Sequence, residues 1–255
     1  MHTTSVPESS VIPDIQPVHR APRAGCFKNS FHEKACDMTE TTTLREQLQD
    51  FQDGFALRAA PERRQTMERA TAKLRASGIE ASALKAGDVA PDVTLLDARG
   101  VPTSLSSLWR LGPLVVVFYR GGWCPYCNLE LRAWQALLPE LSARGASLVA
   151  ISPQTPDNSL STAEKNTLAF PVLSDSALAA ADAFGISFDM GEELVALYAK
   201  GGNDLPVFNG NGRWALPIPA TYVVDTNGTI AYAHVEADYR KRAEPSEVLE
   251  HVRRA

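Results

Sequence analysis

Apolar residues form a short, uninterrupted run at Leu114–Tyr119, and the residues after it change to a helical period. A run this short that is apolar at every position is typical of a strand covered on both faces. It is followed by two glycines, by Trp-Cys-Pro-Tyr-Cys at 123–127, and by Leu131, Trp134 and Leu138 at helical spacing. We therefore predict a buried strand, a turn that carries two cysteines, and an amphipathic helix.

The chain beyond this helix continues to alternate short strands and helices. Ser147–Ile151 is predicted to be the next strand, and the handedness of crossover connections places it parallel to the first. The turn-rich stretch 201–212 is expected to be a surface excursion with a hairpin around Val207 and Trp214. The other predicted elements are helices at 157–169, 177–184 and 192–199, strands at 93–96 and 171–173, a hairpin at 221–225 and 229–235, and a last helix from Pro245 to about Arg253.

Two amphipathic helices are predicted upstream of the first strand. Thr43 and Glu46 have the spacing of a capping box, and apolar residues then recur at intervals of four, three and four. Pro61 suits the first turn of a second helix, which Gly78 ends. We expect these helices, within residues 43–80, to pack on the main domain as structural cover without chemistry of their own.

The N-terminal residues 1–42 contain several prolines, serines and threonines and show no apolar periodicity. Such a segment buries too little apolar surface to offset the entropy of ordering, so we expect a disordered tail. A second hypothesis starts the natural protein at Met38, just before the first helix. The expected organisation is a tail at 1–42, a helical extension at 43–80 and the main domain at 84–253.

Composition and charge exclude several classes of function. The net charge is −5, the basic and acidic residues are mixed along the chain, and no basic stripe suits a phosphate backbone, so nucleic acid is not an expected partner. No apolar run approaches the roughly 18 residues that cross a membrane, and the first 40 residues lack a signal-type apolar block. We expect a soluble, cytoplasmic protein with no membrane partner.

The cysteines point to redox chemistry. The chain has four, too few for a disulfide scaffold, and Cys124 and Cys127 lie three apart after a strand. A zinc site would need two more ligands, and the spacing of Cys26 and Cys36 is not that of a zinc knuckle, so no metal is expected. None of the five histidines is near the pair in sequence, which argues against a Cys-His hydrolase.

The predicted position of the pair explains how a thiol would be activated. With Cys124 at the cap of the helix and Cys127 in its first turn, the two sulfurs lie on one side, close enough to bond. The unpaired N–H groups and the positive end of the helix dipole favour the thiolate, which is the attacking form. Pro125 suits the first turn because its missing N–H would have had no partner there. Arg120 is a candidate source of further positive charge.

These residues resemble the thioredoxin-fold superfamily, and more closely its peroxiredoxin branch, the alkyl hydroperoxide reductase and thiol-specific antioxidant group. The resemblance covers roughly Leu84 to Val252. It implies a thioredoxin-like α/β fold of the peroxiredoxin type, with a central mixed sheet flanked by helices, to which the N-terminal helical extension is added. It implies no cofactor. The segments that carry it are Ala86–Asp92, Val116–Tyr119, Phe170–Asp175, Ala183–Gly185 and Pro219–Asp225.

The resemblance also assigns roles to single residues. A peroxiredoxin carries Pro-x-x-x-Thr-x-x-Cys; aligning its attacking cysteine with Cys127 places Arg120 at the proline and Cys124 at the threonine. Glu130 matches the glutamate of the family. The peroxide-orienting arginine of the family falls at Pro219, so the full peroxide-activating set is missing from the sequence.

The turn itself resembles the active site of thioredoxin instead. Trp123 precedes the first cysteine as it does there, and Pro219 occupies the place of the cis-proline that thioredoxins set against their thiols. The sequence thus resembles a peroxiredoxin-like subgroup that combines a peroxiredoxin body with a thioredoxin Cys-x-x-Cys.

Three functions are compatible with this mixture. In a thiol peroxidase, Cys127 attacks a hydroperoxide, Cys124 condenses with the sulfenic acid, and thioredoxin, glutathione or a similar thiol reduces the disulfide. In a thioredoxin-like disulfide reductase, Cys124 attacks a protein disulfide and Cys127 resolves it. The third is a non-catalytic redox sensor. We favour the peroxidase, with a homodimer as a possible assembly.

Overall fold

The computed structural model describes residues 42–252. The predicted tail, apart from its last residue, lies outside this range, as do Cys26 and Cys36. The helices are α1 (Leu44–Arg58), α2 (Pro61–Ala76), α3 (Ile79–Ser82), α4 (Leu105–Trp109), α5 (Pro125–Ala143), α6 (Pro156–Asn166), α7 (Ala179–Ala183), α8 (Glu192–Lys200), α9 (Leu205–Asn209) and α10 (Pro245–Leu249). The strands are β1 (Thr94–Asp97), β2 (Pro102–Ser104), β3 (Leu114–Phe118), β4 (Ser147–Ser152), β5 (Val172–Ser174), β6 (Ser187–Asp189), β7 (Ala215–Pro217), β8 (Ala220–Val224) and β9 (Ile230–Val235).

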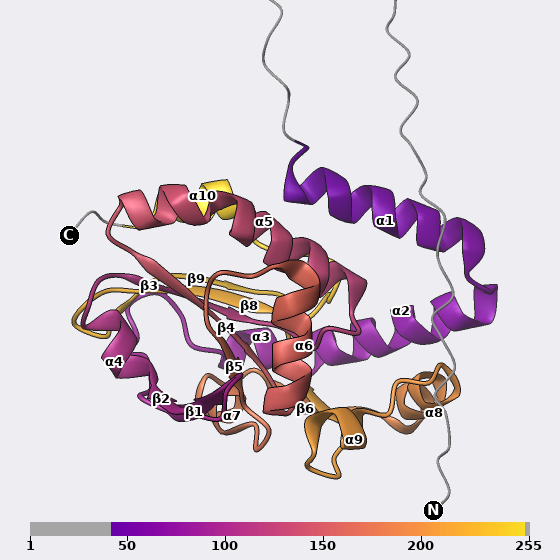
Figure 1. Cartoon of the computed structure of the whole chain (residues 1–255). Helices are drawn as coiled ribbons and strands as arrows, with labels where there is room; N and C mark the ends of the chain where they lie inside the picture. Colours follow the sequence, from indigo (N-terminus) through magenta and orange to yellow (C-terminus); the bar gives the residue numbers. More distant parts are fainter. Residues whose placement is uncertain (1–41, 253–255) are drawn as a thin grey trace, which may run out of the picture. The chain divides into compact units, whose positions relative to one another are not determined.

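A seven-stranded mixed sheet in the order β2-β1-β5-β4-β3-β8-β9 forms the centre of the domain (Figure 1). The predicted parallel pair is confirmed: β3 pairs with β4 from Leu114 opposite Ser147 to Phe118 opposite Ile151, and α5 makes the crossover. On its other side β3 runs antiparallel to β8. The residues that follow β3 are therefore positioned by a fully buried strand that is paired on both sides.

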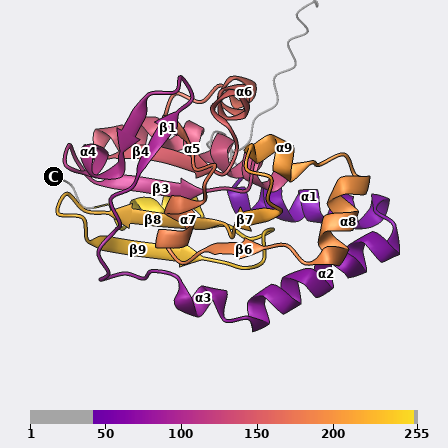
Figure 2. The same ribbon diagram turned by 90° about the horizontal axis from the view of Figure 1, so that it is seen from below.

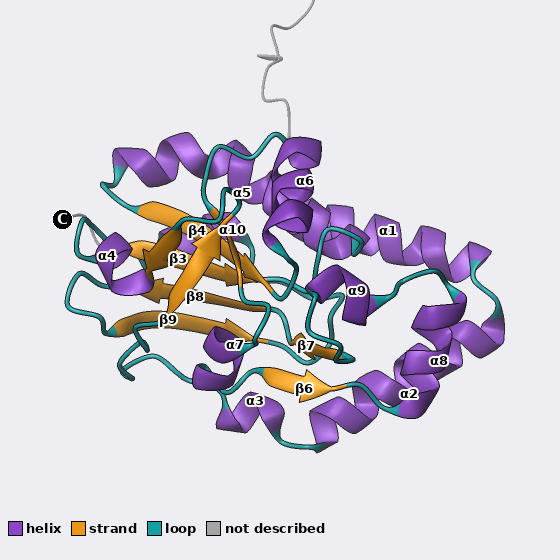
Figure 3. Cartoon of the chain, turned by 60° about the horizontal axis from the view of Figure 1, so that its bottom comes forward, coloured by secondary structure: helices purple, strands orange, loops and turns teal. Residues whose placement is uncertain are grey.

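Helices cover both faces of this sheet, as the apolar pattern predicted (Figure 3). On one face, Val115 and Val117 of β3 join a core with Leu131 and Trp134 of α5. On the other face, Phe118 belongs to a second core, to which α3, α4 and α7 contribute. The uninterrupted apolar run of β3 is therefore explained by two cores that meet at one strand.

The N-terminal extension lies beyond one end of the sheet. In two perpendicular views, α1 and α2 gather there with α8 (Figures 1 and 2). The predicted capping box is confirmed at the start of α1, where the side chains of Thr43 and Glu46 bond to each other's backbone N–H groups. The carboxylate of Glu244, just before α10, also accepts from the backbone N–H of Arg45 at 3.0 Å. The C-terminal segment thus helps to fix the entry of α1.

The hairpin predicted around Val207 and Trp214 is wrong. Val207 lies in the short helix α9, because the carboxylate of Asp204 caps its N-terminus and Leu205 is buried. Trp214 lies just before β7, and β7 pairs with β6 instead of with a strand around Val207. The last helix is also shorter than predicted, since α10 ends at Leu249. The predicted β8–β9 hairpin is confirmed.

The cap of α1 gives a stability prediction. Substituting Thr43→Ala removes the side-chain acceptor of the capping box and should lower the free energy of unfolding by about 1 kcal/mol, measured by urea denaturation. Thr42→Ala is the matched control, because Thr42 is exposed and, among residues 42–252, makes only a backbone hydrogen bond, through its carbonyl, with Gln47. Equal stability of the two variants would contradict a stabilising role for the cap.

Candidate active site

The turn between β3 and α5 is fixed by its two glycines and by neighbouring amides. Gly121 has a φ of 146°, a region that residues with a Cβ rarely adopt. The N–H of Gly122 donates to Gln154 Oε1 at 2.6 Å, and Asn128 Nδ2 donates to the carbonyl of Gly122 at 2.8 Å. A Cβ on Gly122 would meet Thr162 Oγ1 at 2.2 Å. These contacts hold the backbone that leads into the cysteines.

The two cysteines lie where the sequence predicted them. Cys124 is the N-cap residue of α5, and Pro125 and Cys127 both lie in its first turn. Both are free thiols in this structure. Both are also deeply buried: Cys124 is 2% exposed and Cys127 is 0% exposed. A redox pair is therefore present, but it is not displayed on the surface.

A second arginine, which no sequence motif indicates, contacts the pair. Arg242 Nη2 lies 3.3 Å from Cys127 Sγ, and Arg242 Nε donates to Glu130 Oε2 at 2.6 Å. The side chains of Arg242 and Glu130 are 1% and 0% exposed. Arg242 lies 115 residues after Cys127, in the loop between β9 and α10, so no local motif announces it. A guanidinium beside the thiol is thus present, although the aligned position holds Pro219.

Arg120, the predicted source of positive charge, is buried near Cys124. It is 3% exposed and donates to the hydroxyl of Tyr198. Its guanidinium carbon lies 4.5 Å from the ring centre of Tyr239 and 5.2 Å from that of Trp123. The aromatic faces partly compensate a charge that has left water.

The pKa values of the two cysteines are shifted in opposite directions. Burial alone would raise the pKa of Cys124, but a hydrogen bond from Cys127 and the charges of Arg120 and Arg242 lower it to about 6. Burial raises the pKa of Cys127 well above its ordinary value, and its hydrogen bond to Cys124 and the charge of Cys124 act in the same direction. Of the two coupled thiols, Cys124 is the one that ionises more readily.

Glu130 is a buried carboxylate with a raised pKa. Burial raises its pKa to about 7, while the charge of Arg242 opposes this. The carboxylate orients the guanidinium that contacts Cys127, so Glu130 acts on the thiols through Arg242.

A cavity of about 120 Å³ reaches Cys124 but not Cys127. Its walls come largely from the predicted extension and from α8, with Phe51 and Phe55 of α1, Arg63 and Met67 of α2, and Leu197 and Tyr198 of α8. The extension, which the sequence predicts to be structural cover, contributes side chains to the wall around the more acidic thiol. The sequence could not show this because the contact joins segments about 60 residues apart.

Pro219 departs from the thioredoxin comparison. Its peptide bond is trans, as are all peptide bonds among residues 42–252, so the expected likeness to a cis-proline is wrong. Pro219 lines a separate small cavity of about 30 Å³, together with Arg120 and Tyr239, and does not line the cavity that reaches Cys124.

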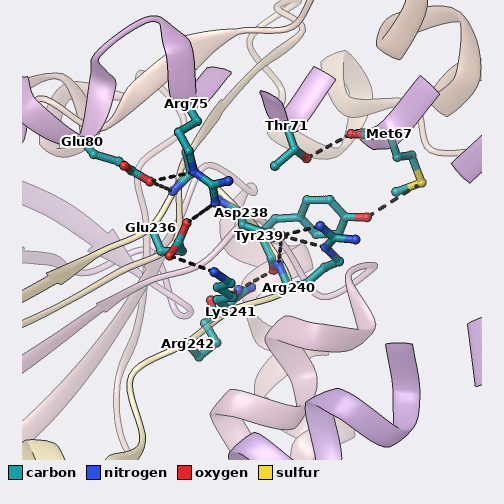
Figure 4. A network of polar contacts seen from close by, with 11 residues as sticks. Met67, Thr71, Arg75, Glu80, Glu236, Asp238, Tyr239, Arg240, Lys241 and Arg242 are labelled. Atoms are coloured by element: carbon teal, nitrogen blue, oxygen red, sulfur yellow. Dashed lines mark hydrogen bonds and ion pairs between the residues drawn. The ribbon is translucent and has the colours of Figure 1, made fainter. Parts of the chain in front are cut away.

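A network of polar contacts ties the extension to the loop that carries Arg242 (Figure 4). Arg75 of α2 contacts Glu236 at 2.8 Å, and Glu80 of α3 accepts from the backbone N–H of Ala237 at 2.7 Å. The hydroxyl of Tyr239 lies 3.8 Å from the sulfur of Met67. The helices of the extension thus help to hold Tyr239 and Arg242 in place.

The described residues contain neither a cluster of metal-binding side chains nor a membrane-spanning helix. Within the described part of the chain, no group of three or more histidine, cysteine or acidic side chains could hold a metal ion. No helix between residues 42 and 252 is both long and apolar enough to cross a membrane.

The charge of Arg242 can be tested through the pKa of Cys124. In the double variant Glu130→Gln/Arg242→Gln, which removes the ion pair as a unit, the pKa of Cys124 should rise from about 6 to about 7 or above, because one of two nearby positive charges is lost. Absorbance of the thiolate at about 240 nm against pH gives the midpoint. The single variant Glu130→Gln is the control: it keeps the guanidinium, so the midpoint should not rise. An unchanged midpoint in the double variant would refute the role of Arg242.

Comparisons with known proteins agree with this geometry. A family model described as the AhpC/TSA family matches residues 86–233, more than half of the 255-residue chain. The chain is similar to the chloroplastic peroxiredoxin Q of Sedum lineare, with 29% identity over 160 residues that cover 63% of this chain and 73% of that protein. It is also similar to peroxiredoxin Bcp of Escherichia coli, with 31% identity over 103 residues, 40% of this chain and 65% of that one.

A solved structure agrees with the fold. The crystal structure of peroxidoxin BcpB from Mycobacterium tuberculosis matches with a TM-score of 0.53 and 24% identity, over 66% of this chain and 96% of that one. The predicted thioredoxin-like fold of the peroxiredoxin type is thus confirmed. The family match begins before β1 and ends within β9; it includes the turn with both cysteines and Glu130, and excludes α1, α2 and Arg242. The chain belongs to the AhpC/TSA family.

Proposed function

We propose that this protein is a thiol-dependent peroxidase that reduces hydroperoxides through a dithiol–disulfide cycle of Cys124 and Cys127. Relatives named as peroxiredoxins support the activity. The observation that carries the assignment to these residues is the placement of one acidic thiol, Cys124, at a cavity, with a second thiol one turn away and two buried guanidinium groups beside them.

The cavity and the ionisation favour Cys124 as the sulfur that attacks first. A hydroperoxide must reach the thiolate, and only Cys124 lines the cavity and has a lowered pKa. The alignment with the family favoured Cys127 instead, but Cys127 is fully buried and its pKa is raised. We therefore assign attack to Cys124 and resolution to Cys127.

The chemical steps follow from this assignment. The Cys124 thiolate attacks the outer oxygen of the hydroperoxide, the O–O bond breaks, and Cys124 becomes a sulfenic acid while an alkoxide or hydroxide leaves. The leaving oxygen takes a proton from water. Cys127 then attacks the sulfenic sulfur, its thiol proton leaves with the displaced hydroxyl as water, and a disulfide forms.

The two arginines have separate parts in these steps. Arg120 lines the same cavity as Cys124, so its charge stabilises both the thiolate and the negative charge on the leaving oxygen. Arg242 contacts Cys127, so it favours ionisation of that sulfur once Cys124 has lost its negative charge in the sulfenic acid. Glu130 holds Arg242 in this position.

A protein disulfide reductase is less well supported by the geometry. Such an enzyme presents its first cysteine to a folded partner, whereas Cys124 is 2% exposed beneath α1 and α2. Pro219, the second feature that suggested this function, does not line the cavity that reaches Cys124. A non-catalytic sensor would show a single oxidation without repeated turnover in the presence of a reducing thiol.

We also propose a substrate, a reductant and a cellular compartment for this cycle. The substrate is a hydroperoxide, the reductant is thioredoxin, glutathione or a similar thiol, and the two free thiols suit the reducing cytoplasm. The homodimer stays a prediction that size-exclusion chromatography tests.

Exchange of each cysteine separates the two roles. With one equivalent of hydroperoxide, Cys127→Ser should keep the fast first step and accumulate a sulfenic acid on Cys124, trapped by dimedone and located by peptide mass. The serine hydroxyl can still donate a hydrogen bond to Cys124. Cys124→Ser should lose at least about a hundredfold in the rate of this step, because the acidic thiol is gone. A rapid reaction in Cys124→Ser, with the adduct on Cys127, would reverse the assignment.

The pH dependence of the first step is also predicted. Only the thiolate attacks, so the rate should rise as pH increases through about 6, the pKa of Cys124, and then level off. At one pH unit below this midpoint the rate should be about tenfold below its plateau. Stopped-flow tryptophan fluorescence can follow the step, since Trp123 precedes Cys124. A midpoint near the ordinary thiol value of about 8.5 would contradict the ionisation described here.

A further inference from the structure

The cavity that reaches Cys124 is lined by aromatic and positively charged side chains. Among its thirteen lining residues are six aromatic side chains and two arginines, Arg63 and Arg120, and no carboxylate. The chain as a whole carries a net charge of −5. In the disulfide form Cys124 carries no charge, so the wall then has two positive charges and no negative one, and in a protein that is negative overall it attracts a small anion.

The two arginines lie at different depths of this cavity. Arg63 is exposed, with its guanidinium carbon 5.8 Å from the ring centre of Phe55, so it lies where the cavity meets solvent. Arg120 is buried. An anion that enters therefore meets one cation at the mouth and a second beside the sulfur.

The same structure limits what can reach the sulfur from outside. We use the name helical cover for α1, α2 and α8, which all contribute to the cavity wall. Thiol–disulfide exchange requires the attacking sulfur to contact the sulfur under attack. A cysteine on the surface of a folded protein does not reach a sulfur that is 2% exposed behind a cavity of about 120 Å³, unless the helical cover opens.

We propose that the disulfide of this protein is reduced by a small anionic thiol that enters the cavity, rather than by a protein thiol such as thioredoxin. The proposal rests on the proposed peroxidase cycle and names the class of reductant that completes it. The recognising groups are Arg63 at the mouth and Arg120 near Cys124.

The exchange balances with two molecules of thiol. The thiolate of the first attacks Cys124, the S–S bond to Cys127 breaks, and Cys127 leaves as a thiolate that takes up a proton. The thiolate of the second attacks the sulfur of the first in the mixed disulfide and releases Cys124 as a thiolate. The two small thiols are oxidised to their own disulfide, and the two electrons pass to the cysteines of the protein.

The test uses the full-length protein oxidised with diamide, so that it does not depend on peroxide turnover. Reduction is followed with 2-mercaptoethanesulfonate, 2-mercaptoethanol and cysteamine, which have similar size and carry a negative, neutral and positive group. We expect second-order rate constants, expressed per thiolate, to fall in that order, with about a tenfold difference between the anionic and cationic thiols. Equal rates or the opposite order would overturn the proposal.

Reduction by thioredoxin, kept reduced by its reductase and NADPH, is measured on the same oxidised protein. We expect a smaller second-order rate constant than with 2-mercaptoethanesulfonate. A larger one would overturn the proposal while leaving the peroxidase function intact. Peroxide consumption, measured separately on the same preparation, decides the proposed function itself.

Charge removal at the mouth provides the matched comparison. Arg63→Gln should reduce the preference for the anionic over the neutral thiol about threefold, with the fold of the variant checked by circular dichroism. Arg99→Gln makes the same change in net charge on the turn between β1 and β2, away from the cavity lining, and should keep the wild-type preference. An identical preference in Arg63→Gln and Arg99→Gln would overturn the role of Arg63.

Discussion

The guanidinium groups of Arg120 and Arg242 are buried in the interior of this domain beside the two thiols, and both need negative charge or hydrogen-bond acceptors in place of water. Removing a guanidinium from water is costly unless an opposite charge or hydrogen-bond acceptors replace the water. Arg242 has the carboxylate of Glu130 and two backbone carbonyls. Arg120 has a tyrosine hydroxyl and aromatic faces, and within residues 42–252 it makes no ion pair with a carboxylate. The negative charge that completes the balance is the thiolate of Cys124.

This balance links the reactivity of the site to the fold. The thiolate is stabilised by Arg120, which has no carboxylate partner among residues 42–252, and by Arg242, so a reactive sulfur forms part of the electrostatics of the native state. When Cys124 becomes a sulfenic acid or a disulfide, that negative charge is lost, and Arg242 still contacts the remaining sulfur of the pair. The cycle therefore alternates the charge of the site as well as its redox state.

The N-terminal extension lies next to the thiol pair and to the loop that carries Arg242. It lies outside the residues that the family model matches, yet it forms one wall of the cavity that leads to Cys124. Through Arg75, Glu80 and Met67 it also contacts the loop that carries Tyr239 and Arg242. A segment outside the family match thus lines the cavity that reaches Cys124 and contacts the loop that carries Arg242.

The sequence predicted the parts of this account that depend on local pattern. The apolar run of β3, the glycines, the cap position of Cys124 and the turn of α5 are all encoded within about 30 residues, and each is confirmed. Arg242 and the cavity wall could not be predicted, because they approach the cysteines only through tertiary packing over long separations. The failed hairpin near Val207 has a local cause: turn-forming residues also cap short helices, and Asp204 does so here.

The central claim is that Cys124 carries the negative charge of the pair and is the sulfur open to the cavity. The most direct measurement is alkylation of the reduced protein by a limiting amount of iodoacetamide at a series of pH values, with the labelled cysteine located by peptide mass. The account predicts label on Cys124, with a rate that rises through a midpoint near pH 6, and Cys127 unlabelled. Preferential labelling of Cys127 would contradict it.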